Sequence, residues 1–297
     1  MGWAIFLIAM GAFGLIEWTS SDEDTSEEQV DDAPEEQPEE PQVCDGVEIL
    51  VEGDATLVET TECDDLILTD VDSANNITVE AGDGADTLTG SEYLSDSELF
   101  GEDGDDVITD AGYANTLHGG AGDDTLSSDG ARATLFGDEG DDHLTLEGRI
   151  TNFERMLADG GEGDDTLVSG FGLPDQVNQS VNSTLSGGAG ADRFELDVLA
   201  SDLTQHSFDG TFDTGITIDD FESGEDVLVI DPYSTFASND ASFSRFEVVP
   251  SADASGTHVV LYYTHPDLPE ERGIAVELAG AAGVTASDVQ IVGGTTV

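Results

Sequence analysis

A nine-residue spacing of apolar residues is the feature that most constrains what this chain can fold into. Aliphatic residues follow one another at this interval without a break: Leu99, Ile108, Leu117, Leu126, Leu135 and Leu144. In Thr125-Leu126-Ser127 the apolar residue lies between two polar ones, which predicts a three-residue strand with one inward-facing side chain. Stacked strands of this kind predict a solenoid with a thin core rather than a globular fold.

Glycine- and aspartate-rich stretches recur on the same spacing. They read "AGDGADTLT" from Ala81, "GEDGDDVIT" from Gly101, "GGAGDDTLS" from Gly119, "GDEGDDHLT" from Gly137, "GGEGDDTLV" from Gly160 and "GGAGADRFE" from Gly187. Subtracting successive start numbers gives 20, 18, 18, 23 and 27, and 18 is the length of two nonamers. Between them lie degenerate nonamers such as "DAGYANTLH" from Asp110, which keep the leucine but lose the sixth-position aspartate. Each coil is therefore predicted to contain two strands and two turns, of which one is a Gly/Asp turn.

The pattern G-G-x-G-x-D-x-U-x resembles the RTX, or haemolysin-type, calcium-binding nonapeptide over about residues 81–195. The resemblance implies an all-β fold, a right-handed parallel β-roll, with several Ca²⁺ ions held between stacked turns. By the same resemblance, the side-chain ligands are the position-six aspartates: Asp86, Asp106, Asp124, Asp142, Asp165 and Asp192. The other turn residues assigned to the metal sites are Gly82, Gly84, Gly101, Asp103, Gly104, Gly119, Ala121, Gly122, Gly137, Glu139, Gly140, Gly160, Glu162, Gly163, Gly187, Ala189 and Gly190.

The chemistry of calcium explains this combination of residue types. Ca²⁺ takes six to eight oxygen ligands, and a turn that directs its carbonyls to one point can supply several. Glycine permits the positive φ that such a turn needs. Aspartates on neighbouring coils repel one another until a divalent ion lies between them, so metal binding is expected to supply folding free energy. The position-five acids Asp105, Asp123, Asp141 and Asp164 are either outer partners of the site or solvated, and we expect them to be solvated.

The overall charge excludes one class of partner. The chain has 67 acidic residues against six arginines and no lysine, with a formal net charge of −61. Nucleic acid is excluded because there is no basic patch to meet phosphate. A solvated acidic surface accounts for the acids outside the repeats, but it does not explain the fixed register of the turn aspartates.

The two edges of the roll are expected to differ. If the extra residues of the longer coils bulge out as loops, the last of them near Pro174, all six Gly/Asp turns stack on one edge and enclose five gaps. On the opposite edge, position six holds Asn115 and Ala133, and Arg132 occupies a position five. The sequence therefore predicts up to about five Ca²⁺ ions in one row.

The remaining segments divide the chain further. Residues 1–18 are apolar, too short for an ordinary membrane span, and are expected to be an anchor or an export-related segment. Residues 19–42 form an acidic, proline-punctuated stretch that predicts a disordered spacer. Residues 43–80 predict an N-terminal β cap, 81–195 the calcium β-roll, and 196–297 a C-terminal β-rich cap.

Two features point to an extracellular protein. Cys44 and Cys63 precede the repeats, either as unrelated thiols or, as we expect, as a disulfide. The stretches "ITIDDFESGEDVLVID" and "VELAGAAGVTASDVQIV" resemble the segments that follow RTX repeats in proteins exported by type I secretion. That resemblance implies a Gram-negative source, the type I machinery as a partner, and an uncleaved C-terminal signal.

No known catalytic motif stands out. The chain has neither H-E-x-x-H nor G-x-S-x-G, and its five histidines are scattered, with His118 and His143 expected at the surface. The sequence thus predicts a calcium-binding, non-enzymatic, secreted or cell-surface protein of structural or adhesive type, with residues 2–16 as a candidate attachment to a membrane. The alternatives are a degradative enzyme with an unrecognised site in 196–297 and, less compatible with the lack of a long apolar domain, a membrane-active toxin.

Overall fold

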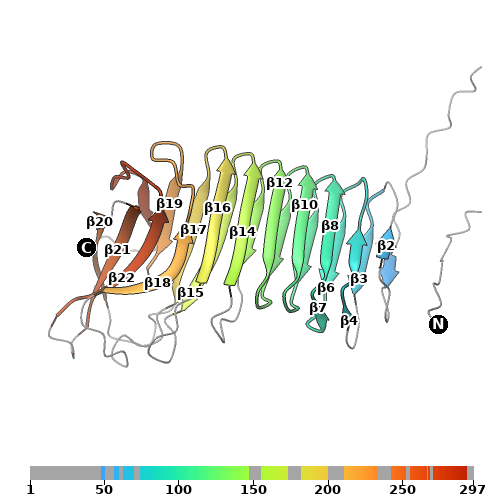
Figure 1. Ribbon diagram of the computed structural model, residues 1–297, viewed down its shortest axis with the longest axis horizontal. Helices are drawn as coiled ribbons and strands as arrows, with labels where there is room; N and C mark the ends of the chain where they lie inside the picture. The colour runs from blue at the N-terminus through green and yellow to red at the C-terminus, as the bar shows by residue number, and fades with distance from the viewer. Residues whose placement is uncertain are drawn as a thin grey trace, which may run out of the picture. The chain divides into compact units, whose positions relative to one another are not determined.

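The regular structure in the described part of the chain consists of β-strands, as the computed structural model shows (Figure 1). The structure describes residues 48–50, 57–59, 63–69, 74–146, 155–172, 182–199, 211–232, 242–251, 255–265, 267 and 270–292. Contacts divide the chain into residues 1–43 and 44–297, and all described residues belong to the second unit. The apolar segment 1–18 and the spacer 19–42 therefore lie outside the described residues. Within those residues, no helix is long and apolar enough to cross a membrane.

Two long sheets face each other across the core. In the order of their pairing, the strands of the first, sheet A, are β1 (Glu48–Leu50), β3 (Leu66–Thr69), β6 (Thr87–Gly90), β9 (Val107–Asp110), β11 (Thr125–Ser128), β13 (His143–Leu146), β15 (Thr166–Gly172), β17 (Arg193–Leu199), β19 (Val227–Asp231) and β23 (Val289–Ile291). All neighbouring pairs within this sheet are parallel.

The second sheet, sheet B, collects the alternate strands. Its order is β2 (Leu57–Glu59), β5 (Thr78–Glu80), β8 (Glu98–Asp103), β10 (Thr116–Ala121), β12 (Thr134–Glu139), β14 (Arg155–Glu162), β16 (Asn182–Ala189), β18 (Thr211–Ile218), β22 (Arg272–Ala279), β21 (Gly256–Thr264) and β20 (Ser242–Pro250). The chain thus winds from sheet to sheet, which confirms the predicted parallel β-roll. A short third sheet pairs β4 (Ala74–Asn75) with β7 (Leu94–Ser95).

The strands are longer than the predicted three residues. Strands β8, β10 and β12 each continue through the first three residues of the Gly/Asp turn, so that Gly120 and Ala121 pair with Glu102 and Asp103. The turn itself is correspondingly tighter. Between the last residue of β8 and the first of β9 lie just the three residues 104–106.

Among the six repeats, the extra residues of the longer coils lie on one side. Gly90 pairs with Asp110, and Ser95 pairs with Tyr113. The separation in sequence between the paired residues is two residues larger for the first pair than for the second. The first two extra residues therefore lie between Gly90 and Ser95. The later insertions lie between β13 and β14 and between β15 and β16. These are connections from sheet A to sheet B, whereas the six Gly/Asp turns run from sheet B to sheet A and keep one length. The predicted loop around Pro174 lies outside the described residues.

The core is a double column of inward-facing apolar side chains. Sheet A contributes Ile67, Leu88, Ile108, Leu126, Leu144, Leu167, Phe194 and Leu228, and sheet B contributes Val79, Leu99, Leu117, Leu135, Ala158, Leu185 and Ile218. Each is at most 1% exposed. Burial of one such leucine contributes about 2 kcal/mol, which makes the repeated apolar position the main source of packing energy in each coil.

The roll continues beyond the recognised repeats at both ends. Strands in 48–80 extend both sheets, and β18, β19, β22 and β23 extend them after residue 195. At the C-terminal end, sheet B changes direction: β21 pairs antiparallel with both β22 and β20. This antiparallel end covers the last coil, and it buries Val259, Leu261 and Ile274.

Candidate metal centre

The six Gly/Asp turns form one continuous stack. The amide of the position-four glycine donates to the position-three carbonyl of the next turn, as Gly104 does to Ala121 and Gly122 to Glu139, both at 2.8 Å. The same bond joins Gly84 to Asp103, Gly140 to Glu162 and Gly163 to Ala189. The structure therefore brings the turn residues assigned from the sequence onto one edge. Each position-three carbonyl keeps a second lone pair for another partner.

The position-six aspartates form a ladder along this edge. In each turn the Oδ1 atom accepts a hydrogen bond from the backbone amide of the position-six residue one coil earlier. Asp106 donates to Asp124 at 2.7 Å, and Asp124 donates to Asp142 at 2.8 Å. The same bond joins Asp86 to Asp106, Asp142 to Asp165 and Asp165 to Asp192. One oxygen of each carboxylate is thus fixed by the neighbouring coil.

The other oxygen, Oδ2, is buried without a partner. This holds for Asp86, Asp106, Asp124, Asp142 and Asp165, whose residues are at most 2% exposed. A buried carboxylate oxygen that accepts no hydrogen bond is costly. Five such oxygens in equivalent positions form a row of anionic atoms that a cation would satisfy.

The position-one glycines leave the space beside these oxygens. A Cβ atom added to Gly119 would collide with Oδ2 of Asp124 and come within 2.7 Å of the carbonyl oxygen of Gly137 in the next turn. Gly101, Gly137 and Gly160 have equivalent surroundings. Each glycine therefore borders a cradle formed by its own turn's carboxylate and the next turn's carbonyl. The first turn differs, because position one is Ala81.

Glycine is also needed at position four. Gly122 has a φ of 140°, and an added Cβ would collide with the carbonyl oxygen of Gly104. This backbone is strained for other residues and allows the turns to stack closely. The backbone at position two is also left-handed, but this position does not require glycine. Glu102 and Asp138 occupy it with φ values of 79° and 78°.

Burial of the carboxylates changes their acidity. Desolvation raises the pKa of Asp86, Asp124, Asp165 and Asp192 from 3.8 to about 7, and that of Asp106 and Asp142 to about 6. Neighbouring carboxylates add to the rise: Asp106 and Asp142 do so for Asp124. The edge is therefore poorly suited to holding its negative charges without a cation.

The position-five aspartates are exposed, but they are not simply solvated. Oδ1 of Asp105 accepts from the amide of Asp123, and Oδ1 of Asp123 accepts from the amide of Asp141, both at 3.0 Å. Asp141 and Asp164 continue the series. The expectation of mere solvation was wrong, because each of these side chains reaches an amide of the next coil.

The opposite edge repeats the ladder with neutral groups. The amide of Ile77 donates to Oγ of Ser97, and the amide of Ser97 donates to Oδ1 of Asn115, both at 3.0 Å. The Asn115 amide group also donates to Asp110 at 2.9 Å and to the carbonyl of Leu94 at 3.2 Å. Asp110, the buried acid here, further accepts from the amide of Gly112 at 3.1 Å. These polar groups are thus satisfied within the protein.

Two members of the aspartate ladder escaped the sequence analysis. The amide of Asp65 donates to Oδ1 of Asp86 at 2.5 Å, and the amide of Asp192 donates to Oδ1 of Asp226 at 3.0 Å. The signals were present as "DDLIL" from Asp64 and "GEDVLV" from Gly224. At the C-terminal end the free oxygen is absent, because Oδ2 of Asp226 accepts from the amide of Glu222 at 2.7 Å. Asp226 thereby closes the row.

A degenerate turn that contains Asp65 precedes the turn from Ala81. Cys63 occupies position four of this degenerate turn and lies beside Gly84. It is disulfide-bonded. The expected partner, Cys44, lies outside the described residues. The bond thus attaches to the chain directly before the first members of the aspartate ladder.

The donor set fits a hard cation. Within the described residues no three His, Cys, Asp or Glu side chains converge as a metal cluster. Each cradle is lined by a carboxylate oxygen and a backbone carbonyl oxygen. Carboxylate and carbonyl oxygens are the ligands that Ca²⁺ prefers. The residues that would hold it are the position-six aspartates and the position-one carbonyls of the adjacent turn.

Fold and edge together define a parallel β-roll with cation-binding turns. A family model for the RTX calcium-binding nonapeptide repeat matches the chain in four copies, at residues 78–92, 100–135, 158–172 and 182–197. The chain therefore contains RTX repeats, and these repeats are of the calcium-binding kind. The turn from Gly137 lies outside the matched stretches but has the same place in the stack. A search of curated proteins finds no match.

Proposed function

We propose that this protein is secreted or displayed at the cell surface, where calcium closes the roll into a structural or adhesive module. The observation that carries the proposal is the row of buried, unpartnered Oδ2 atoms on one edge. Without a cation these groups oppose folding, and with one they favour it, so that folding and binding are coupled. The net charge of −61 strengthens the coupling, because self-repulsion favours the open chain.

Export before folding is consistent with this coupling. A chain that stays open at low calcium is suited to passage through a type I exporter, and it would close in calcium-rich surroundings. The disulfide at Cys63 supports an oxidising destination. The C-terminal stretch that resembles an export signal contributes β22 and β23, so it would become part of the fold after export.

The number of ions follows from the same edge. Five unpartnered oxygens, on Asp86, Asp106, Asp124, Asp142 and Asp165, support a row of up to about five Ca²⁺ ions. The neutral partners on the opposite edge argue against a second row. Anomalous diffraction at a wavelength sensitive to calcium would count and place the ions, and two rows of similar length would contradict this arrangement.

Circular dichroism of the full chain tests the coupling itself. Calcium-free protein should lack most of its β signal, and millimolar calcium should restore it, whereas millimolar magnesium should not. An unchanged spectrum after chelation would overturn the proposal. Fractionation of the native host would test the location separately.

We also propose that the protein is not an enzyme. One contact bears on the alternative of a degradative activity in residues 196–297: Ser251 Oγ lies 3.2 Å from Nδ1 of His258. A serine bonded to a histidine is one element of a hydrolase site, but a third, orienting group is also needed. A hydrolase screen with the variant Ser251→Ala decides between the two, since activity lost in the variant would establish the enzyme.

A further inference from the structure

Three stacked rings lie on the outer face of sheet B. Register places Glu80, Phe100, His118, Phe136 and Asp159 in one row across β5, β8, β10, β12 and β14. The ring centroids of Phe100 and His118 are 4.7 Å apart, and those of His118 and Phe136 are 4.8 Å apart. The planes of neighbouring rings differ by 11° and 16°. We call Phe100, His118 and Phe136 the aromatic row.

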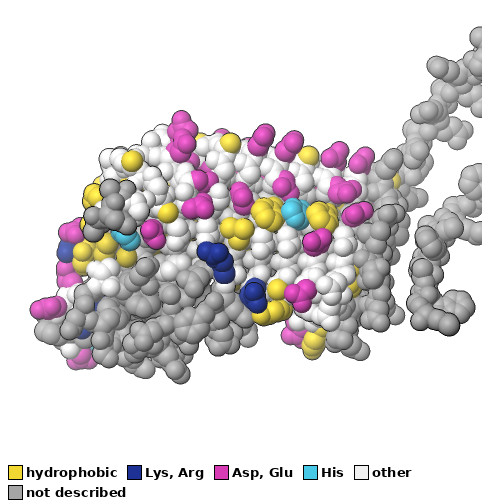
Figure 2. Space-filling model, in the orientation of Figure 1, with side chains coloured by type: hydrophobic (Ala, Val, Ile, Leu, Met, Phe, Trp, Pro, Cys, Tyr) yellow, Lys and Arg dark blue, Asp and Glu magenta, His cyan; other side chains and the backbone are white. Residues whose placement is uncertain are grey.

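Nothing in the fold requires rings at these positions. They point away from the core, are partly exposed, and lie beside polar outward residues such as Thr116 and Thr134. Figure 2 shows this face, where hydrophobic and histidine side chains lie among acidic ones. Because the rings stack on one another, each inner ring face is covered. At each end of the row the next residue in register is a carboxylate, Glu80 beside Phe100 and Asp159 beside Phe136.

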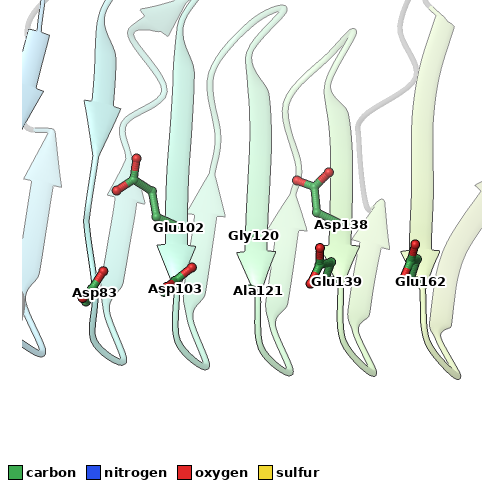
Figure 3. A pocket seen from close by; sticks show the side chains of 8 residues that line it. All are labelled: Asp83, Glu102, Asp103, Gly120, Ala121, Asp138, Glu139 and Glu162. Carbon is green, nitrogen blue, oxygen red and sulfur yellow. The ribbon is translucent and has the colours of Figure 1, made fainter.

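A hollow borders the row on the side of the Gly/Asp turns. Its floor is Gly120 and Ala121 on β10, and its walls include Glu102 on β8 and Asp138 on β12 (Figure 3). The volume is about 590 Å³. Glu102 and Asp138 are two strand spacings apart, about 9.6 Å between their backbones, which suits an extended cationic group better than a single bound ion. Asp138 also lies 3.1 Å from Nδ1 of His118, which links the hollow to the aromatic row.

Charge selects the occupant of this surface. A second copy of the chain would bring acidic groups against acidic groups, because the net charge is −61. A planar guanidinium group can pack against an aromatic ring and bond a neighbouring carboxylate through paired N–H groups, which an ammonium group cannot do. We propose that the aromatic row and the adjoining hollow dock an arginine-rich segment of another protein.

The test uses the full, calcium-loaded chain and a labelled nine-residue peptide of alternating arginine and serine. At 150 mM salt, fluorescence anisotropy should show binding that is about tenfold weaker for the matched lysine peptide. The double variant Phe100→Thr and Phe136→Thr should weaken binding of the arginine peptide by a similar factor. Threonine is chosen because it already occupies outward positions of the same sheet, at Thr116 and Thr134.

The controls separate a specific surface from general acidity. Glu102→Gln with Asp138→Asn should weaken binding, whereas Glu92→Gln with Asp129→Asn, two exposed acids near the opposite edge, should change it less than twofold. Equal losses in both charge variants, or equal binding of the two peptides, would overturn the proposal. A dimer in sedimentation that the phenylalanine variant abolishes would also overturn it, in favour of self-association. If the phenylalanine variant fails to fold, the two charge variants still decide the question.

Discussion

Asp123 and Asp124 are neighbours in the sequence and reach in opposite directions along the roll. Oδ1 of Asp124 accepts a hydrogen bond from the amide of Asp106 in the preceding coil, at 2.7 Å. Oδ1 of Asp123 accepts one from the amide of Asp141 in the following coil, at 3.0 Å. The adjacent acids therefore connect three coils. Of the two, Asp124 is buried, and its Oδ2 atom has no hydrogen-bond partner.

Replacing Asp124 by asparagine should have opposite effects with and without calcium. The asparagine side chain keeps an oxygen that can accept the hydrogen bond from the Asp106 amide. It removes the buried negative charge of Asp124, whose carboxyl pKa is raised to about 7. At pH 8 the calcium-free variant should therefore be more stable than the wild type. Calcium binding in the cradle formed by Asp124 and the Gly137 carbonyl should weaken by about tenfold or more, since affinity depends on ligand charge. Calorimetric titration measures the affinity, and the β signal of the two calcium-free proteins in circular dichroism measures the difference in stability.

Asp123→Asn is the matched control, because Asp123 is exposed. Its calcium affinity should change by no more than about twofold, in keeping with the small effect of exposed charges. Equal losses of affinity in the two variants would show that overall charge, rather than the buried row, binds the ions.

Gly119→Ala should remove one cradle without changing the charge. The added methyl group would collide with Oδ2 of Asp124, whose carboxylate is held in place by the preceding coil. We expect one fewer bound ion and a lower midpoint of thermal unfolding in calcium. The reverse change, Ala81→Gly, should strengthen binding at the first turn. Full stoichiometry in the alanine variant would show that the cradle is not where the ion binds.

The pH dependence should change sign with calcium. The folded pKa values of about 6 to 7 lie above the ordinary 3.8, so the stability that protonation gives the metal-free fold is complete below about pH 4 and is lost as the pH rises through 7. Protein freed of calcium on a chelating resin should therefore gain β structure between pH 8 and pH 5. With calcium present, affinity should fall over the same interval, because protons and Ca²⁺ compete for the carboxylates. Loss of structure on acidification of the metal-free protein would contradict this account.

Asn115→Ala should reduce stability but leave the number of bound calcium ions unchanged. Asn115 is 1% exposed and bonds Ser97, Leu94 and Asp110 on the opposite edge. Removing it leaves a buried amide and a buried carboxylate short of a partner, at a cost of about 2 kcal/mol. Thermal unfolding and calcium titration of the same sample measure both quantities, and a lost ion would place a site on this edge.

The cysteines give a prediction about the N-terminal end of the roll. If Cys63 is bonded to Cys44, mass spectrometry of protein from the medium will show no free thiol, and reduction will destabilise the fold by about 3 kcal/mol. Two alkylatable thiols in the native secreted protein would refute the pairing.

The parallel roll could be predicted because its signal is periodic. Leu99, Leu117 and Leu135 recur at every second nonamer and pair directly in sheet B. The extent of the roll was harder to see, because the outer coils keep the apolar residue but lose the glycines. Thr78–Glu80 and Val227–Asp231 continue the two sheets without a complete nonamer.

The position-six aspartates were predicted by the resemblance, but their contacts were not. Motif spacing places Asp124 in a turn, yet it does not show which coil its two oxygens face. Asp65 and Asp226 were missed because the motif search relied on glycines, whereas the ladder needs the aspartate and the strand after it. The aromatic row escaped notice because Phe100, His118 and Phe136 each end a degenerate nonamer, outside the Gly/Asp stretches that define the motif.

The one-sided placement of the insertions makes the two edges unequal as sites for redesign. Between Gly90 and Ser95 the chain already accommodates two additional residues, and the connection between β15 and β16 accommodates more. Foreign loops, tags or whole domains grafted at these connections should be tolerated at constant calcium stoichiometry. A single residue added between Gly122 and Asp124 would move Asp124 out of register with Asp106 and deform the cradle of that turn. The molecule thus offers protein engineers one face that accepts new sequence and another that must be copied residue for residue.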